Sequence, residues 1–263
     1  MPRWIENPGF RPPPGGLAAE WARMRRDARP LPRPLVFLGG WRAPSWPIRI
    51  LARRIRELVG ADRAQVLPVS FAFTGSLQEA ARRSVEEVRR RWPGEGEGTA
   101  EVDVVGVSMG GLVARLAAAP ELWCRPAGPV RGEPGRPRPG PASPAAGLRI
   151  ARLFTIATPH KGASIARWIC PDRAARDMRA GCELVSRLND RPRPYELVCY
   201  ARLRDWWVGA TNAAPPGEEP IWVDAWTLLS HNAVTMDKLI RTDLARRLRG
   251  EEPLGNPSRP PRD

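Results

Sequence analysis

The segment that most constrains the fold lies at residues 102–119. A mostly apolar run, VDVVGV, leads directly into Gly106-Val107-Ser108-Met109-Gly110, and residues 110–119 are predicted to form a helix rich in small side chains. An apolar run of this length is typical of a strand buried on both faces, and glycines on both sides of the serine permit a sharp strand-to-helix turn. The pattern therefore predicts a covered parallel sheet with Ser108 exposed at the carboxyl end of one strand.

Short apolar runs alternate with amphipathic helices over much of the chain. In one of these helices Leu51, Ile55 and Leu58 recur at helical spacing. This alternation predicts an α/β fold, with a mostly parallel central sheet and helices on both faces. We expect strands at 34–38, 65–69, 102–107, 148–157 and 196–201, and helices at 47–59, 76–91, 110–119 and 233–248.

Segments rich in proline and arginine suggest the domain organisation. We expect 1–33 to be an N-terminal extension, 34–249 to be the folded domain and 250–263 to be a disordered tail. Residues 125–147 are so rich in proline, glycine and arginine that they cannot bury a core, and we predict a mobile surface loop there.

Charge and metal-ligand spacing narrow the class of function. The formal net charge is +14, but the arginines are scattered along the chain, so we do not expect nucleic acid as a partner. The charge is compatible with transient contact with an anionic membrane surface. The two histidines and four cysteines form no C-x-x-C or H-x-x-x-H pair, so a structural zinc module is not expected.

No targeting or membrane-spanning signal is recognised in the sequence. Residues 1–34 contain no apolar stretch of the kind found in secretory signals, and no run approaches the ~18 apolar residues of a transmembrane helix. We therefore expect a cytoplasmic protein without a transmembrane segment.

Two motifs carry a resemblance to a known superfamily. VDVVGVSMGGLVAR at 102–115 resembles the nucleophile elbow of the lipase and esterase branch of the α/β-hydrolases. ATPHKG at 157–162 resembles the T-P-H-x-G segment of bacterial triacylglycerol lipases and of glycosylphosphatidylinositol-inositol-deacylase-like proteins. The resemblance extends from about residue 34 to 248. It implies an α/β-hydrolase fold with a small helical cap, expected at 163–194, but neither motif specifies a substrate.

The resemblance also implies a catalytic triad in the order nucleophile, acid, histidine. Ser108 is then the nucleophile and His231 the general base, because only His231 leaves room for an acid between them. The alternative, His160, is interpreted as a hydrogen-bonded loop histidine near the pocket wall. Asp205 is the predicted acid, since it follows the strand at 196–201 in a segment that resembles the family's D-x-x-V turn; Asp224 is the alternative.

Two backbone N–H groups are expected to form the oxyanion hole. One belongs to Met109, the residue after the nucleophile, and the other to Trp41 in the loop after the first strand. Lipases usually have His-Gly in that loop, whereas this sequence has Gly39-Gly40. The missing histidine is a departure from the family, but the expected donor is backbone and is retained.

These inferences predict a serine hydrolase that cleaves carboxylic esters through an acyl-enzyme. The substrate would be a small-molecule or lipid ester, and no metal or cofactor is implied. An acyltransferase or thioesterase with the same triad is an alternative, as is a catalytically idle α/β-hydrolase that acts as a binding protein. The sequence does not determine acyl chain length, head group or oligomeric state.

Overall fold

In the part of the chain that the structure describes, the core is a six-stranded sheet in which every strand is parallel to its neighbours. The computed structural model describes residues 5–96, 98–123, 147–164, 166, 172–224 and 230–261. The strand order is β2-β1-β3-β4-β5-β6, so the chain winds outward in both directions from β1. The strands are β1 (Leu35–Trp41), β2 (Val66–Phe71), β3 (Val102–Val107), β4 (Ile150–Ile156), β5 (Glu196–Arg202) and β6 (Ile221–Val223).

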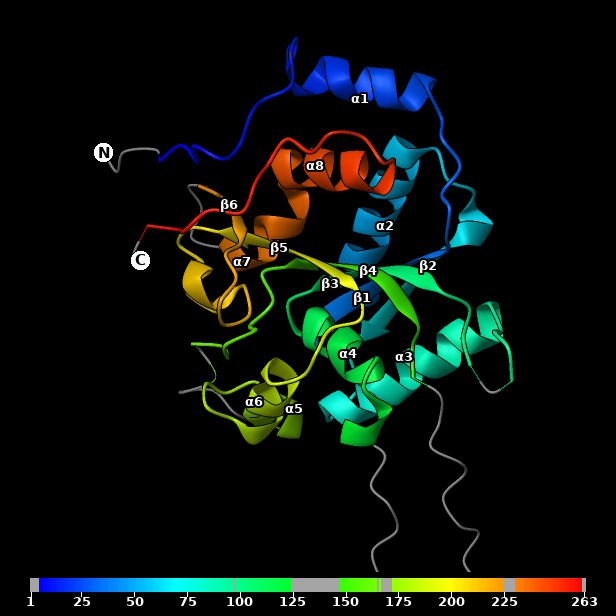
Figure 1. The fold of residues 1–263 in the computed structure, drawn as a ribbon, viewed down its shortest axis with the longest axis vertical. Coiled ribbons are helices and arrows are strands. Elements are labelled where there is room, and N and C mark those ends of the chain that lie inside the picture. Colours follow the sequence, from blue (N-terminus) through cyan, green and yellow to red (C-terminus); the bar gives the residue numbers. More distant parts are fainter. Residues whose placement is uncertain are drawn as a thin grey trace, which may run out of the picture.

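Helices cover both faces of the sheet (Figure 1). One face carries α1 (Gly16–Arg26), α2 (Ser45–Val59) and α8 (Lys238–Leu248), which pack against one another. The other face carries α3 (Leu77–Arg91), α4 (Met109–Ala117), α5 (Arg173–Asp177) and α6 (Glu183–Asn189). The four-residue helix α7 (Ser230–Ala233) precedes α8, and short 3₁₀ turns lie at Arg63–Gln65, Pro120–Leu122, Ala210–Asn212 and Val234–Met236.

Two apolar cores, one on each side of the sheet, explain why the strands read as continuous apolar runs. On β1, Val36 and Leu38 belong to the core beneath α3 and α4, while Leu35 and Phe37 belong to the core beneath α2 and α8. All four side chains are fully buried. The predicted fold class, a mostly parallel sheet with helices on both faces, is confirmed, and the short helices α5 and α6 lie in the segment expected to form a cap.

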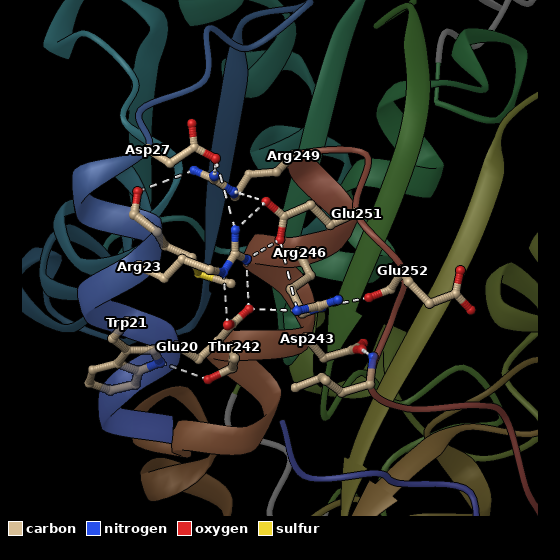
Figure 2. Close-up of polar contacts among 12 residues, drawn as sticks. Glu20, Trp21, Arg23, Asp27, Thr242, Asp243, Arg246, Arg249, Glu251 and Glu252 are labelled. Atoms are coloured by element: carbon tan, nitrogen blue, oxygen red, sulfur yellow. Dashed lines mark hydrogen bonds and ion pairs between the residues drawn. The ribbon is translucent and has the colours of Figure 1, made fainter. Parts of the chain in front are cut away.

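The N-terminal segment belongs to the folded domain and is not the extension that we expected. Helix α1 packs on α2 and α8, and Met24 on its inner face is fully buried. Figure 2 shows ion pairs that bind this helix to the end of the chain: Glu20 accepts hydrogen bonds from Arg23 and Arg246, and Arg23 also pairs with Glu251. Arg23 of α1 therefore pairs with an acid of the C-terminal segment, and Arg246 of α8 pairs with an acid of α1.

The expectation of a disordered tail is likewise wrong for residues 250–261. The Oδ1 atom of Asp243 accepts hydrogen bonds from the backbone N–H groups of Leu254 and Gly255, at 2.6 and 2.9 Å. Gly255 also forms an isolated bridge with Phe10. A buried carboxylate on α8 therefore fixes a segment whose composition suggested disorder.

Some predicted boundaries were wrong, and others cannot be compared. The helix expected at 233–248 begins at Lys238, because the Asp237 side chain caps it by accepting hydrogen bonds from the N–H groups of Leu239 and Ile240. Strand β6 and helix α1 were not predicted. Nearly all of the loop expected at 125–147, and residues 165 and 167–171 of the expected cap, lie outside the described residues. Among the described helices, none is both long and apolar enough to cross a membrane.

Candidate active site

Ser108 occupies a strained turn between β3 and α4, at the carboxyl edge of the sheet. Its φ of 53° lies in a region that is unfavourable for residues other than glycine. The flanking glycines make the turn sterically accessible: a Cβ atom on Gly106 would lie 2.5 Å from the Gly111 Cα, and one on Gly110 would lie 2.2 Å from the Leu38 carbonyl oxygen. Close backbone packing therefore requires the glycines that flank Ser108.

Ser108, His231 and Asp205 form a continuous hydrogen-bonded chain. The His231 Nε2 atom lies 3.0 Å from the Ser108 Oγ, and its Nδ1 lies 2.8 Å from the Asp205 Oδ2. A carboxylate can only accept, so Nδ1 carries the proton of the neutral ring. Nε2 is then free to accept a hydrogen bond from the Ser108 hydroxyl. The structure thus brings together the three residues that the sequence analysis proposed as a triad.

Asp205 is held rigidly by the turn that follows β5. Its Oδ1 accepts hydrogen bonds from the N–H groups of Trp207 and Val208, at 3.0 and 3.2 Å, which leaves Oδ2 directed at His231. The Trp207 ring stacks on the His231 ring, with centroids 5.2 Å apart and planes inclined by 11°. No sequence signal predicted this stacking.

His160 lies in a separate polar cluster. It is completely buried, and its Nδ1 accepts a hydrogen bond from Arg115 at 2.9 Å while its Nε2 contacts the Thr155 hydroxyl at 3.0 Å. Burial, together with the charge of Arg115, holds the pKa of His160 well below its usual value, so the ring is neutral. Arg115 also donates to the Leu188 carbonyl, so the cluster joins α4 to α6.

Asp224, the alternative acid, has other partners. Its Oδ2 accepts hydrogen bonds from the Ile5 N–H at 2.9 Å and from the Arg204 guanidinium at 3.2 Å. These contacts join the N-terminal segment to the end of β6. Asp205, not Asp224, is the carboxylate that contacts His231.

The end of β1, where the sequence predicted a loop, and the start of α4 lie beside Ser108. A Cβ atom on Gly40 would lie 3.5 Å from the Ser108 Cβ, so Gly40 is in close contact with the nucleophile turn. Trp41 is the last residue of β1, and Met109 is the first residue of α4. First-turn N–H groups have no acceptor within their own helix, which leaves the Met109 N–H available to a ligand.

A cavity of about 590 Å³ opens over Ser108 and His231. Its walls are mostly apolar and include Ile48, Met178 and Val208. Among the described residues, no group of three or more histidine, cysteine, aspartate or glutamate side chains is arranged to hold a metal ion. The cavity therefore presents the Ser108 hydroxyl, the His231 ring and an apolar surface to a bound molecule.

Solved structures of lipases have a similar fold. The chain resembles mature lipase BlEst2 from Bacillus licheniformis with a TM-score of 0.54 at 14% identity, covering 80% of this chain and 89% of that one. For the propeptide form of BlEst2 the TM-score is 0.58 at 13% identity, covering 88% and 54% of the two chains. For Aspergillus fumigatus lipase B it is 0.52 at 11% identity, covering 98% and 64%. The chain therefore spans less than two thirds of the last two proteins.

These similarities show that the chain has the α/β-hydrolase fold that these structures share. The sequence matches no protein-family model and no curated protein.

Proposed function

We propose that the protein is a serine hydrolase that cleaves carboxylic esters through an acyl-enzyme. The observation that carries this proposal is the chain of hydrogen bonds from Ser108 through His231 to Asp205, which opens into an apolar cavity. A serine hydroxyl is a weak nucleophile unless a base accepts its proton, and His231 lies at the distance that this transfer requires.

The reaction then follows from the positions of these groups. The Ser108 Oγ attacks the ester carbonyl carbon while the His231 Nε2 takes the hydroxyl proton, and Asp205 stabilises the resulting imidazolium. The tetrahedral intermediate collapses, the carbon–oxygen bond to the alcohol breaks, and His231 gives its proton to the leaving oxygen. Water repeats the sequence on the acyl-enzyme, which releases the acid and restores the Ser108 hydroxyl.

The negative charge of the tetrahedral intermediate needs donors that are fixed in advance. We assign this role to the backbone N–H groups of Met109 and Trp41, on either side of Ser108. Removal of one such donor from an enzyme costs about 2.7–4 kcal/mol of transition-state stabilisation. The proximity of Gly40 to Ser108 supports the assignment of the Trp41 loop.

The cavity favours a substrate with an apolar acyl group. Trp46, Trp207 and Met236 line it and are each at least 40% exposed, so the apolar surface continues outward from the site. Tryptophan is favoured where an apolar phase meets water. Together with the net charge of +14, this surface supports a lipid ester as substrate and transient contact with an anionic membrane surface.

Labelling with a fluorophosphonate probe tests the proposal without knowledge of the natural substrate. We expect the probe to modify Ser108, located by mass spectrometry of the labelled peptide. Ser108→Ala should abolish labelling, and His231→Ala should slow it strongly. Ser186→Ala, which alters an exposed serine on α6, is the matched control and should label normally. A folded chain that does not label would contradict the hydrolase proposal and favour a binding protein.

An ester panel then separates hydrolysis from acyl transfer. We expect p-nitrophenyl esters to release free acid, and longer acyl chains to lower KM until the cavity is filled. Adding an alcohol acceptor tests the alternative: product ester formed in preference to free acid would identify an acyltransferase.

A further inference from the structure

Asp172 joins the proposed oxyanion loop to the cap. Its Oδ2 accepts hydrogen bonds from the indole Nε1–H of Trp41 and from the Nε–H of Arg42, each at 3.0 Å. Its Oδ1 accepts from the backbone N–H of Ala175 at 2.8 Å, which caps α5. One carboxylate therefore anchors the last residue of β1 and the first residue of the following loop to a helix that is more than a hundred residues away in sequence.

The loop that Asp172 holds has an unfavourable backbone conformation. Arg42 has a φ of 49°, in the left-handed region that non-glycine residues rarely adopt. Its guanidinium carbon lies 5.5 Å from the centre of the Trp41 ring, so the two side chains also contact each other. Such a conformation persists only where surrounding contacts maintain it, and the contacts with Asp172 are of that kind.

Trp41, where β1 passes into this loop, supplies one of the proposed oxyanion donors. The Trp41 N–H must remain fixed while charge develops on the substrate oxygen, because a donor that has to reorient during the reaction stabilises the transition state less. Trp41, Arg42, Ser108 and Ala175 all line the cavity, so the end of β1, the loop after it and the capped end of α5 all border it.

We propose that Asp172 is a positioning residue for the oxyanion hole. By fixing the Trp41 and Arg42 side chains, it fixes the peptide that presents the Trp41 N–H to the substrate, and it makes the geometry of the hole depend on the docking of α5. This inference rests on the proposed function. It concerns a residue that acts through Trp41 and does not itself take part in bond making or breaking.

Asp172→Asn is the informative substitution. An asparagine oxygen can still cap α5, since asparagine is among the preferred capping residues. The new amide N–H₂ cannot accept, however, so the side chain can no longer satisfy Ala175, Trp41 and Arg42 together. Trp41→Phe tests the same contact from the other side, because it removes the indole N–H and keeps an aromatic ring and the backbone N–H.

The matched control is Asp62→Asn. Asp62 also precedes a short helix and caps it, but it is exposed. It lies before β2, at the amino ends of the strands, whereas the cavity lies at their carboxyl ends. The control reports what the loss of a capping carboxylate does to this protein away from the cavity.

The readouts are kcat and KM for a soluble p-nitrophenyl ester, the rate constant of fluorophosphonate labelling, and the thermal unfolding midpoint. For Asp172→Asn we expect kcat to fall by about 10- to 100-fold, in line with a displaced oxyanion donor. KM should change by less than about threefold, since only transition-state binding is lost. Labelling should slow in parallel with kcat. Asp62→Asn should keep the kinetic constants of the unaltered chain.

The pair of substitutions also tests whether the effect passes through one contact. Trp41→Phe should also lower kcat, and the kcat of the double variant should be only slightly below that of Asp172→Asn alone. If Asp172→Asn reduces the folded fraction, Trp41→Phe decides the question, because it leaves the cap of α5 intact.

Several results would overturn the inference. Unchanged kcat in both variants, or a raised KM at unchanged kcat, would mean that Asp172 does not position the hole. If Ser108 is labelled in the unaltered chain and equally fast in both variants, this inference is rejected, whereas the proposed function is unaffected. Absence of labelling in the unaltered chain would reject the proposed function and this inference with it.

Discussion

Replacing Asp205 by asparagine would change which ring nitrogen of His231 carries the proton. The Asp205 Oδ1 accepts two backbone N–H groups of its own turn, at Trp207 and Val208. In Asp205→Asn the amide oxygen should keep those two bonds, which directs the N–H₂ group at the His231 Nδ1. That nitrogen must then accept, so the proton moves to Nε2 and faces the Ser108 hydroxyl.

The size of the effect follows from this geometry. A histidine protonated at Nε2 cannot take the Ser108 proton, and the wrong tautomer in a serine hydrolase lowers kcat by about 10⁴-fold. That factor corresponds to about 5.4 kcal/mol in the activation free energy. Aspartate and asparagine have nearly the same shape, and the turn keeps its backbone hydrogen bonds. We therefore expect the thermal unfolding midpoint to change little.

The assay is steady-state ester hydrolysis, with fluorophosphonate labelling as a second measure of Ser108 reactivity. Asp224→Asn is the matched control, because it makes the same carboxylate-to-amide change at a buried site whose partners are Arg204 and Ile5. We expect the control to keep kcat within about threefold per folded molecule. An Asp205→Asn variant with a kcat within about tenfold of the unaltered chain would refute the tautomer argument and the assignment of Asp205.

Three further predictions concern stability. Gly110→Ala should lower the free energy of unfolding in urea by at least roughly 2 kcal/mol, because its Cβ would lie 2.2 Å from the Leu38 carbonyl oxygen. The pKa of Glu20 is lowered from 4.5 to about 2, mainly by a hydrogen bond from Arg23. The ionised Glu20 carboxylate therefore stabilises the fold fully above pH 4.5, and this stabilisation is lost as the pH falls towards 2. Glu20→Gln should flatten this part of an acid-unfolding curve. Burial lowers the pKa of His160, so only the unfolded chain binds a proton there, and the free energy of unfolding should fall as the pH drops below about 6.5. If His160→Gln leaves the slope of this free energy against pH unchanged, the prediction is contradicted.

Local sequence was sufficient to predict five of the six described strands, in their order along the chain, and the turn that holds Ser108. The strand at 102–107 and the turn around Ser108 are determined by residues that are neighbours in sequence, because burial on both faces requires a continuous apolar run and tight backbone packing requires glycine. The resemblance of 102–115 and 157–162 to lipases added the expected order of Asp205 and His231 along the chain.

Tertiary structure decided the contacts between distant residues. Ser108 and His231 are 123 residues apart, and their hydrogen bond exists because the carboxyl ends of parallel strands meet at one edge of the sheet. The attachment of Asp172 to Trp41, 131 residues away, has no motif that could have predicted it. The N-terminal helix shows the same limit. Its composition suggested an extension outside the folded domain, but the hydrogen bond between Glu20 and Arg246 forms only when α1 and α8 pack together. Polarity and periodicity describe each segment's own preferences, whereas the neutralisation of a charge depends on which other segment folds against it.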